Sequence, residues 1–260
     1  MIKLTKATIH KYKSVETEQF FNVEDDVTVL VGMNESGKTS LLEALAKVNY
    51  FDEDNDFQYN MTHDFPRKQK KAVEKSGEIP NAVTLTYLLS DDLIESIEKD
   101  IGINIDTKEI SYTKKYNNQG SFTPIPIDIK AFLSSKLKKF GNDAEKYLDD
   151  LSLAKNKEDF NKVIATAKSN NEVSEVISSL EILGNYYKNA WNWENPVEEY
   201  VCRVYIKDNL PKFMYYDDYY MLPSRISIEN LQKGKSTENS DKTAKALLEL
   251  ADIDIDKLTK

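Results

Sequence analysis

Apolar and polar residues alternate along four stretches of the chain, which is the pattern of half-buried β-strands. In the first stretch the alternation slips once in phase, so the predicted strand carries a β-bulge. The expected strands are residues 1–11, with residues 19–21 as their partner, 83–89, 109–116 and 199–206. Ser90, followed by two aspartates, predicts the start of a helix that runs to about Ile101.

The composition changes between Ile127 and Ala190, where Lys, Glu, Asp, Asn, Leu and Ala dominate and strand-type alternation almost disappears. We expect three or four helices there. An apolar stripe at helical spacing is formed by Val173, Val176, Ile177, Leu180 and Leu183. Because strand-rich sequence lies on both sides, the segment is predicted to be an insertion that packs as its own small bundle.

A short apolar run, residues 27–31, predicts a buried strand that feeds directly into a tight turn. Leucines and a valine at helical spacing follow from Thr39 onward and predict an amphipathic helix. Between them the residues fit G-x-x-x-x-G-K-[ST] at every fixed position: Gly32, Met33, Asn34, Glu35, Ser36, Gly37, Lys38 and Thr39, with Ser40 starting the helix. Strand, glycine loop and helix thus follow in the order that places a helix N-terminus against a polyphosphate.

The chemistry of phosphate binding explains each fixed residue of this loop. Backbone N–H groups must converge on phosphate oxygens, and glycine lets the chain turn sharply and approach closely. Lys38 would supply a mobile positive charge to the β- and γ-phosphates, and the Thr39 hydroxyl is placed to ligate Mg²⁺.

The overall composition narrows the function classes further. The chain of 260 residues has 44 acidic and 35 basic residues and a net charge of −9, which argues against a general nucleic-acid-coating surface but allows a local basic patch. Binding to DNA is therefore possible but unsupported by charge. The single cysteine, Cys202, is expected to be a buried strand thiol. No apolar run approaches the roughly 18 residues of a membrane span and no signal peptide is evident, so we expect a cytoplasmic protein.

The N-terminal sequence resembles a particular group of ATPases. The resemblance rests on Ile2-Lys3-Leu4, on Tyr12-Lys13-Ser14-Val15, and on the Asn-Glu-Ser-Gly-Lys-Thr loop followed by Leu41-Leu42-Glu43-Ala44-Leu45. These segments are similar to the overcoming-lysogenization-defect-like (OLD-like, or AAA_15-type) ATPases, whose head architecture is shared with chromosome-maintenance and double-strand-break-repair ATPases of the ABC class. Two later segments, Asp64-Phe65-Pro66-Arg67 and residues 211–216, are compatible with the same group at lower specificity.

This resemblance implies an α/β fold: the N-terminal lobe of an ABC/SMC-head-like P-loop NTPase, with antiparallel strands and a helical insertion. It also implies ATP and Mg²⁺ as cofactors, a homo-oligomer that forms head-to-head around two nucleotides, and an effector protein or domain, in phage defence or DNA maintenance. By position, Lys13 and Ser14 would approach the nucleotide from the N-terminal sheet. Three residues are alternatives for a side chain that senses Mg²⁺ and the γ-phosphate: Gln58, Arg67 and Gln69.

The chain also departs from this group. It has no Leu-Ser-Gly-Gly-like signature, and its only candidates for the metal-binding and water-activating acids are Asp217 and Asp218, after an apolar run. A true acidic strand would lie beyond residue 260, so we expect the N-terminal part of a longer ATPase that binds nucleotide but hardly hydrolyses it. His10 and His63 are isolated from other metal ligands, and neither suggests a metal or nucleophile site.

Three functions remain open: an ATPase module that drives an effector, a non-hydrolysing nucleotide-dependent regulatory module, and a P-loop kinase or GTPase. The last would need a guanine-binding element, which residues 156–159 imitate within a helical segment. The expected organisation is an N-terminal ATPase lobe over residues 1–126, the insertion over 127–190, and a return to the lobe over 191–260. That last part would contain a polar linker at 232–241 and a helix at about 242–250.

Overall fold

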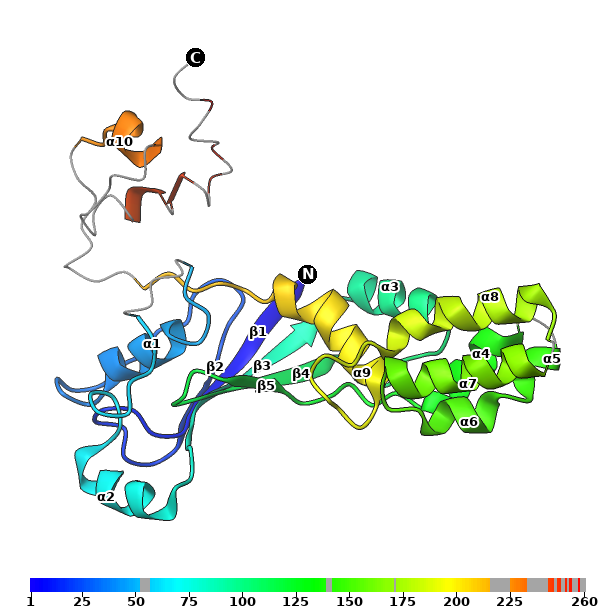
Figure 1. Cartoon of the computed structure of the whole chain (residues 1–260). Helices are drawn as coiled ribbons and strands as arrows, with labels where there is room; N and C mark the ends of the chain where they lie inside the picture. The colour runs from blue at the N-terminus through cyan, green and yellow to red at the C-terminus, as the bar shows by residue number, and fades with distance from the viewer. Residues whose placement is uncertain are drawn as a thin grey trace.

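The computed structural model describes residues 1–51, 57–138, 142–170, 172–215 and 225–232, together with 243–245, 247, 248, 251, 253 and 257. The chain forms an α/β structure in which a central sheet carries α1 and α2 near one end, while a group of helices extends from the other (Figure 1). The α/β fold class predicted from the sequence is confirmed.

The sheet has five antiparallel strands in the order β2-β1-β3-β4-β5. Their bounds are β1 Ile2–Ile9, β2 Gln19–Asn22, β3 Asn81–Leu89, β4 Glu109–Lys115 and β5 Gly120–Phe122. The register between β1 and β3 shifts between Leu4 and Lys6, which confirms the bulge that the slip in alternation predicts. The predicted pairing of the first strand with residues 19–21 is also confirmed.

The two faces of the sheet differ in chemistry. On one face the β3 residues Val83, Leu85, Tyr87 and Leu89 are fully buried. On the other face hydroxyl groups pair across the strands, with 2.9 Å between the Oγ1 atoms of Thr84 and Thr113. Helix α1, Lys38–Ala46, lies against β1 and β3. Its Ala44 is completely buried, so the helix that follows the glycine loop is anchored to the sheet core.

Two helices besides α1 precede β4 along the chain: α2, Arg67–Ser76, and α3, Asp91–Ile101, which begins after Ser90 as predicted. Most of the helices follow β5. The others are α4 Ile129–Leu137, α5 Asn142–Glu145, α6 Leu148–Leu153, α7 Lys157–Ser169, α8 Ser174–Leu183, the 3-10 helix η2 Gly184–Tyr187, α9 Pro196–Val201, and α10 Ile228–Gln232.

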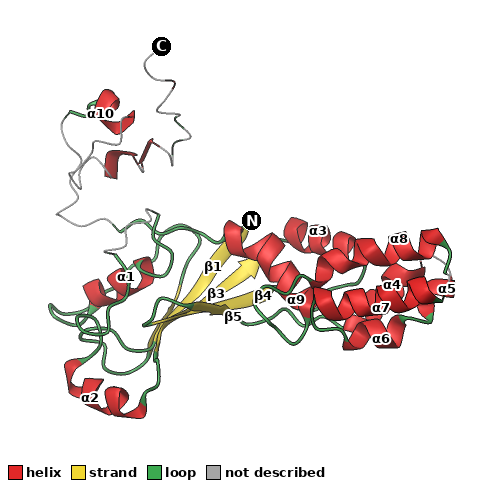
Figure 2. Cartoon of the chain, viewed as in Figure 1, coloured by secondary structure: helices red, strands yellow, loops and turns green. Residues whose placement is uncertain are grey.

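Helices α4 to α8 lie together beyond one end of the sheet (Figure 2). The described part of the segment predicted to hold three or four helices has five α-helices, because α5 and α6 are too short to show a helical period in the sequence. Within the predicted stripe, Val176, Leu180 and Leu183 of α8 are buried, whereas Val173 precedes the helix and is exposed. One continuous hydrophobic cluster includes both these helices and the sheet.

The strand predicted at 199–206 is wrong. These residues continue α9 and pass into a π-helical turn, η3, Cys202–Ile206. The helix start overrides the alternation, because the side chain of Asn195 accepts a hydrogen bond from the Val197 N–H at 3.0 Å and Pro196 occupies the first turn. Cys202 is buried as predicted, but in a helix, and burial raises the pKa of its thiol to about 12.

The strand predicted at 27–31 is also wrong. These residues form no strand, and Val27, Val29 and Val31 are 72%, 73% and 90% exposed. A buried strand needs neighbours on both sides, and the sheet of the described residues ends at β2 without pairing to this run. The apolar character that predicted burial therefore remains at the surface, next to the glycine loop.

After η3 the chain crosses back to the end of α1 (Figure 1). The 3-10 helix η4, Lys207–Asn209, leads to an isolated parallel bridge between Tyr50 and Phe213, with the Phe213 N–H donating to the Asn49 carbonyl at 2.8 Å. The candidate acids Asp217 and Asp218 lie outside the described residues, as do residues 233–241 of the predicted linker. Of the helix predicted at 242–250, residues 243–245, 247 and 248 are described, and they are helical.

Candidate functional site

The glycine loop turns by means of two residues in the left-handed region. Gly37 has a φ of 94° and immediately precedes α1, and Glu35 has a φ of 65°. A left-handed conformation is costly for most residues with a side chain, and glycine adopts it freely. The loop therefore delivers the chain directly into the N-terminus of a nine-residue helix, where backbone N–H groups favour an anion.

The loop folds around the side chain of Lys38. Its Nζ donates to the carbonyl oxygens of Gly32 and Met33, each at 2.8 Å. A Cβ atom on Gly32 would lie 2.7 Å from the Ser36 Oγ, closer than carbon and oxygen can approach without movement. Gly32 therefore packs closely against Ser36, and its carbonyl and that of Met33 hold the Lys38 ammonium group over the loop.

A pocket of about 530 Å³ opens at this point, lined by residues 34–40 of the loop and by Ser14. The Oγ atoms of Ser14 and Ser40 are 3.2 Å apart. A Cβ atom on Gly37 would also lie 3.2 Å from the Ser14 Oγ, so Ser14 packs directly against the loop. The structure therefore brings together Ser14 and the described loop residues, including Thr39 and Ser40, around one cavity.

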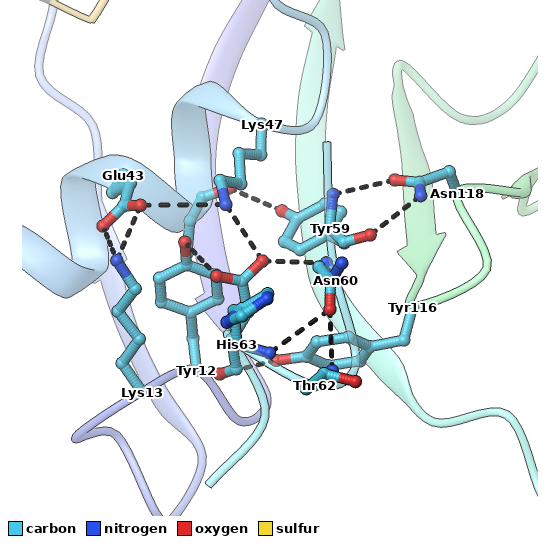
Figure 3. Close-up of polar contacts among 12 residues, drawn as sticks. Tyr12, Lys13, Glu43, Lys47, Tyr59, Asn60, Thr62, His63, Tyr116 and Asn118 are labelled. Atoms are coloured by element: carbon cyan, nitrogen blue, oxygen red, sulfur yellow. Dashed lines mark hydrogen bonds and ion pairs between the residues drawn. The ribbon is translucent and has the colours of Figure 1, made fainter. Parts of the chain in front are cut away.

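Lys13 lies beside this pocket but does not line it. The residue has a φ of 48°, and its Nζ donates to both carboxylate oxygens of Glu43, at 2.7 and 2.5 Å (Figure 3). Glu43 lies on α1, one turn after Thr39. The ammonium group of Lys13 is thus engaged by a carboxylate rather than directed to the loop.

A buried polar network fixes the segment that carries Lys13 and Ser14 to α1. Lys47 Nζ lies 2.9 Å from the Asp64 Oδ2 and 3.7 Å from the Glu43 Oε1. Asp64 also accepts a hydrogen bond from the Tyr12 hydroxyl at 3.3 Å, and its backbone carbonyl accepts one from the Lys13 N–H at 2.6 Å. Burial, and then the nearby charges of Glu43 and Asp64, raise the pKa of Tyr12, which keeps it a neutral donor.

Glu43, Lys47 and Asp64 were not predicted as site residues. Glu43 and Lys47 are spaced by four on the helix after the loop, which is a signal for an ion pair but not for a role at this pocket. Asp64 belongs to a segment that the family resemblance singled out only weakly. Their function here is positional, because they hold the turn at residues 12–15 against the helix that starts at Lys38.

Among the described residues that line this pocket, none is one of the three alternatives for a γ-phosphate sensor. Gln69 Nε2 donates to the carbonyl oxygen of Glu16 at 2.9 Å, two residues from Ser14. Arg67 begins α2 and is exposed, and Gln58 is also exposed.

Other polar candidates have structural roles. His10 contacts Glu18 and Thr84 through its two ring nitrogens, at 2.7 and 2.8 Å, and His63 is exposed. The imitation of a guanine-binding element at residues 156–159 is the start of α7, where the Asn156 side chain accepts a hydrogen bond from the Asp159 N–H at 2.9 Å.

With this geometry in view, comparison with protein families finds that residues 6–257 match the model of an AAA domain. The chain belongs to the AAA domain family. The match spans the sheet, the glycine loop and the helices, and it identifies a nucleotide-binding ATPase module of the AAA/SMC-like kind. A search of curated proteins found no match.

AAA domains bind a nucleotide, generally together with a metal ion, and the loop of this chain fits the phosphate part of such a ligand. The sharp backbone turn at Gly37, the Lys38 ammonium and the helix N-terminus all suit a polyphosphate. For the metal, the pocket offers the exposed hydroxyl of Thr39. The described part of the chain contains no cluster of three or more His, Cys, Asp or Glu side chains that could hold a metal ion.

No helix among the described residues is long and apolar enough to cross a membrane.

Proposed function

We propose that this protein binds ATP with Mg²⁺ at the loop formed by residues 32–40. One observation carries the proposal: the loop, the Lys38 side chain and the Ser14 hydroxyl surround a single 530 Å³ pocket at the N-terminus of α1. A pocket that combines a helix N-terminus, an ammonium group and several hydroxyls matches the needs of a metal-bound triphosphate.

Each residue would then have a distinct task. Backbone N–H groups at the start of α1 would hold phosphate oxygens, and Lys38 would exchange the carbonyls of Gly32 and Met33 for the β- and γ-phosphates. Thr39 would ligate Mg²⁺. Ser14 would close the pocket from the N-terminal sheet. The Lys13 ammonium group would approach the nucleotide once it leaves Glu43. ATP, when bound, supplies an electrophilic γ-phosphoryl group.

The proposal extends to assembly. Three exposed valines precede the loop and Met33 within it is also largely exposed, so an apolar strip borders the nucleotide pocket. Exposed apolar strips on a protein surface are typical of interaction sites. They support the expectation that the module forms a head-to-head dimer around two nucleotides and controls an effector. A role in phage defence or DNA maintenance, as the OLD-like resemblance suggests, belongs to the same proposal.

Calorimetry tests the site. The wild-type chain should bind ATP in the presence of Mg²⁺, and Lys38→Ala should lose that binding because it removes the positively charged side chain at the phosphate loop. Lys71→Ala, which changes an exposed lysine of α2, is the matched control and should bind as the wild type does. Equal affinities for wild type and Lys38→Ala would overturn the assignment.

Turnover measurements separate the modes of action. If the module alone hydrolyses ATP, Asp217→Asn and Asp218→Asn should each reduce the rate by orders of magnitude, as removing a transition-state contact does. If it acts as a non-hydrolysing regulator, the rate stays near background in all three proteins while ATP still changes the oligomeric state in sedimentation. Preference for GTP over ATP would favour a P-loop GTPase instead.

A further inference from the structure

A second and larger cavity lies away from the nucleotide loop. Its volume is about 860 Å³, within the usual range for small-molecule sites. Strands β4 and β5 form one wall, residues 191–193 and 207–212 form another, and Val48 and Asn49 border it after α1. We call this cavity the aromatic pocket.

Aromatic rings form a continuous wall in this pocket. Tyr112 and Phe122 are direct partners on β4 and β5, with their ring centroids 4.7 Å apart. Phe122 stacks on Trp191 at 5.9 Å with an interplanar angle of 13°, and Trp191 contacts Trp193 at 5.7 Å. All four rings are only partly buried, so they offer flat apolar surface to the cavity.

Glycine at position 120 makes this wall possible. A Cβ there would lie 1.8 Å from the Tyr112 hydroxyl oxygen, so the ring of Tyr112 extends over the strand β5 only because Gly120 has no side chain. Phe122, two residues further on the same face, continues the surface.

Positive charge accompanies the rings. Lys114, Lys207 and Lys212 all line the pocket, and none of them forms an ion pair with a described residue. Lys114 lies on the face of β4 that also carries the buried Ile110, where an apolar side chain is the usual occupant. Partial burial lowers the pKa of the Lys114 ammonium group. Asp208 is the one carboxylate among the described lining residues.

We propose that the aromatic pocket binds one nucleotide unit, with its base stacked on the ring wall and its phosphate held by the lysines. Planar rings stack on a base of any sequence, and ammonium groups attract phosphate, which together define the chemistry of nucleotide recognition. The acidic carboxylate of Asp208 suits an amino group on the base. In a chain of net charge −9, three lysines that line one cavity and form no ion pair within the described part of the chain are a local feature that suits an anion.

The site is distinct from the ATP loop. The loop lies at the start of α1, and Val48 and Asn49 lie just beyond its end. A nine-residue helix is about 13 Å long at about 1.5 Å per residue, so the two sites border opposite ends of one helix. The inference therefore stands whether or not residues 32–40 bind ATP.

Tryptophan fluorescence gives a direct test, because the chain has two tryptophans and both line this pocket. The full chain carrying Lys38→Ala, which removes binding at the loop, is titrated with AMP, with a ten-residue deoxyadenosine oligonucleotide and with inorganic phosphate. We expect saturable quenching by a nucleotide. Tighter binding of the oligonucleotide identifies a unit of a single strand as the ligand, and equal or tighter binding of AMP identifies a free nucleotide. Phosphate that binds as tightly as both would overturn the role of the rings.

Two sets of variants locate the effect. Lys114→Met should weaken nucleotide binding about tenfold or more, the effect of losing one charge-assisted contact. Lys115→Met, on the opposite face of the same strand, should leave the affinity unchanged. Because Lys207 and Lys212 are exposed, the double variant Lys207→Ala/Lys212→Ala tests the same pocket without changing a partly buried side chain, and it should also weaken nucleotide binding. Absence of saturable quenching, or equal affinity in the pocket variants and in Lys115→Met, would overturn the proposal.

Discussion

Lys47 and Asp64 form a buried ion pair, with 2.9 Å between the Nζ and Oδ2 atoms and less than a tenth of either side chain exposed. Lys47 follows α1, and Asp64 precedes α2. The backbone carbonyl of Asp64 also holds the Lys13 N–H. The pair therefore connects the helix of the phosphate loop to the turn that delivers Ser14, and it couples the stability of the fold to the shape of the pocket.

Breaking this pair should be strongly destabilising. Asp64→Asn keeps the size of the side chain but leaves the buried ammonium of Lys47 without its main counter-charge, which costs about 3–5 kcal/mol in comparable buried pairs. Urea unfolding measures the change in the free energy of unfolding. Glu181→Gln, which breaks the exposed Lys168–Glu181 pair at 2.9 Å, is the control and should cost less than about 1 kcal/mol.

The double variant Lys47→Met/Asp64→Asn shows whether the unpaired charge is the cause. It removes the stranded ammonium, so its loss of stability should be smaller than the sum of the two single losses. Additive losses would contradict the interpretation that the two charges compensate each other.

Gly37 and Gly77 provide a matched test of the pocket. Both have positive φ, 94° and 69°, so an alanine at either position is strained by roughly 1–2 kcal/mol. Only at Gly37 does the new Cβ meet the Ser14 Oγ, at 3.2 Å, whereas nothing lies within 4 Å at Gly77. We expect Gly37→Ala to weaken ATP binding in calorimetry and Gly77→Ala to leave it unchanged. A similar loss in both would indicate a general effect of strain.

The sequence predicts those parts of the site whose chemistry needs a fixed local spacing. The loop from Gly32 to Thr39 is visible because turn, charge and hydroxyl must follow in one order, and β3 is visible because its alternation reflects a sheet with one apolar face. The placement of Ser14 beside Ser40 could be expected only from the family resemblance, since the ion pair that fixes it joins Lys47 to a residue of another segment.

The two incorrect strand predictions also have physical causes. Residues 199–206 alternate like a strand, but Asn195 and Pro196 start a helix just before them, and a cap of this type outweighs a weak period. Residues 27–31 are as apolar as a buried strand, yet burial depends on neighbouring strands that the run itself cannot specify. The aromatic pocket was not predicted because Phe122 and Trp191, which are far apart in the sequence, meet only through the tertiary fold.

Tyr87 offers a test of core packing. Its side chain is fully buried, and its hydroxyl has no hydrogen-bond partner among the described residues. A buried unsatisfied hydroxyl carries a desolvation penalty, so Tyr87→Phe should stabilise the protein by about 1 kcal/mol. Tyr187 is equally buried, but its hydroxyl donates to the Leu151 carbonyl at 3.1 Å. Tyr187→Phe should therefore destabilise by a similar amount, and thermal unfolding of the two variants should move in opposite directions.

We predict that the charged side chain of Lys114 in the aromatic pocket lowers the stability of the folded protein. Burial lowers its pKa from the ordinary value of 10.5, so the folded state disfavours the charged side chain. At pH 7 Lys114 is charged in the unfolded chain as well, and Lys114→Met, which fills similar space without charge, should melt at a higher temperature than the wild type. As the pH rises through the lowered pKa toward 10.5, the folded state releases its proton before the unfolded state does, and the penalty for burying the charge fades. The advantage of Lys114→Met should therefore narrow in alkaline solution.

Lys115→Met, on the opposite face of β4, is the control for the general effect of removing a lysine. A gap that is absent at pH 7, or that widens with pH, would show that Lys114 is solvated or paired, and that the pocket does not hold an uncompensated charge.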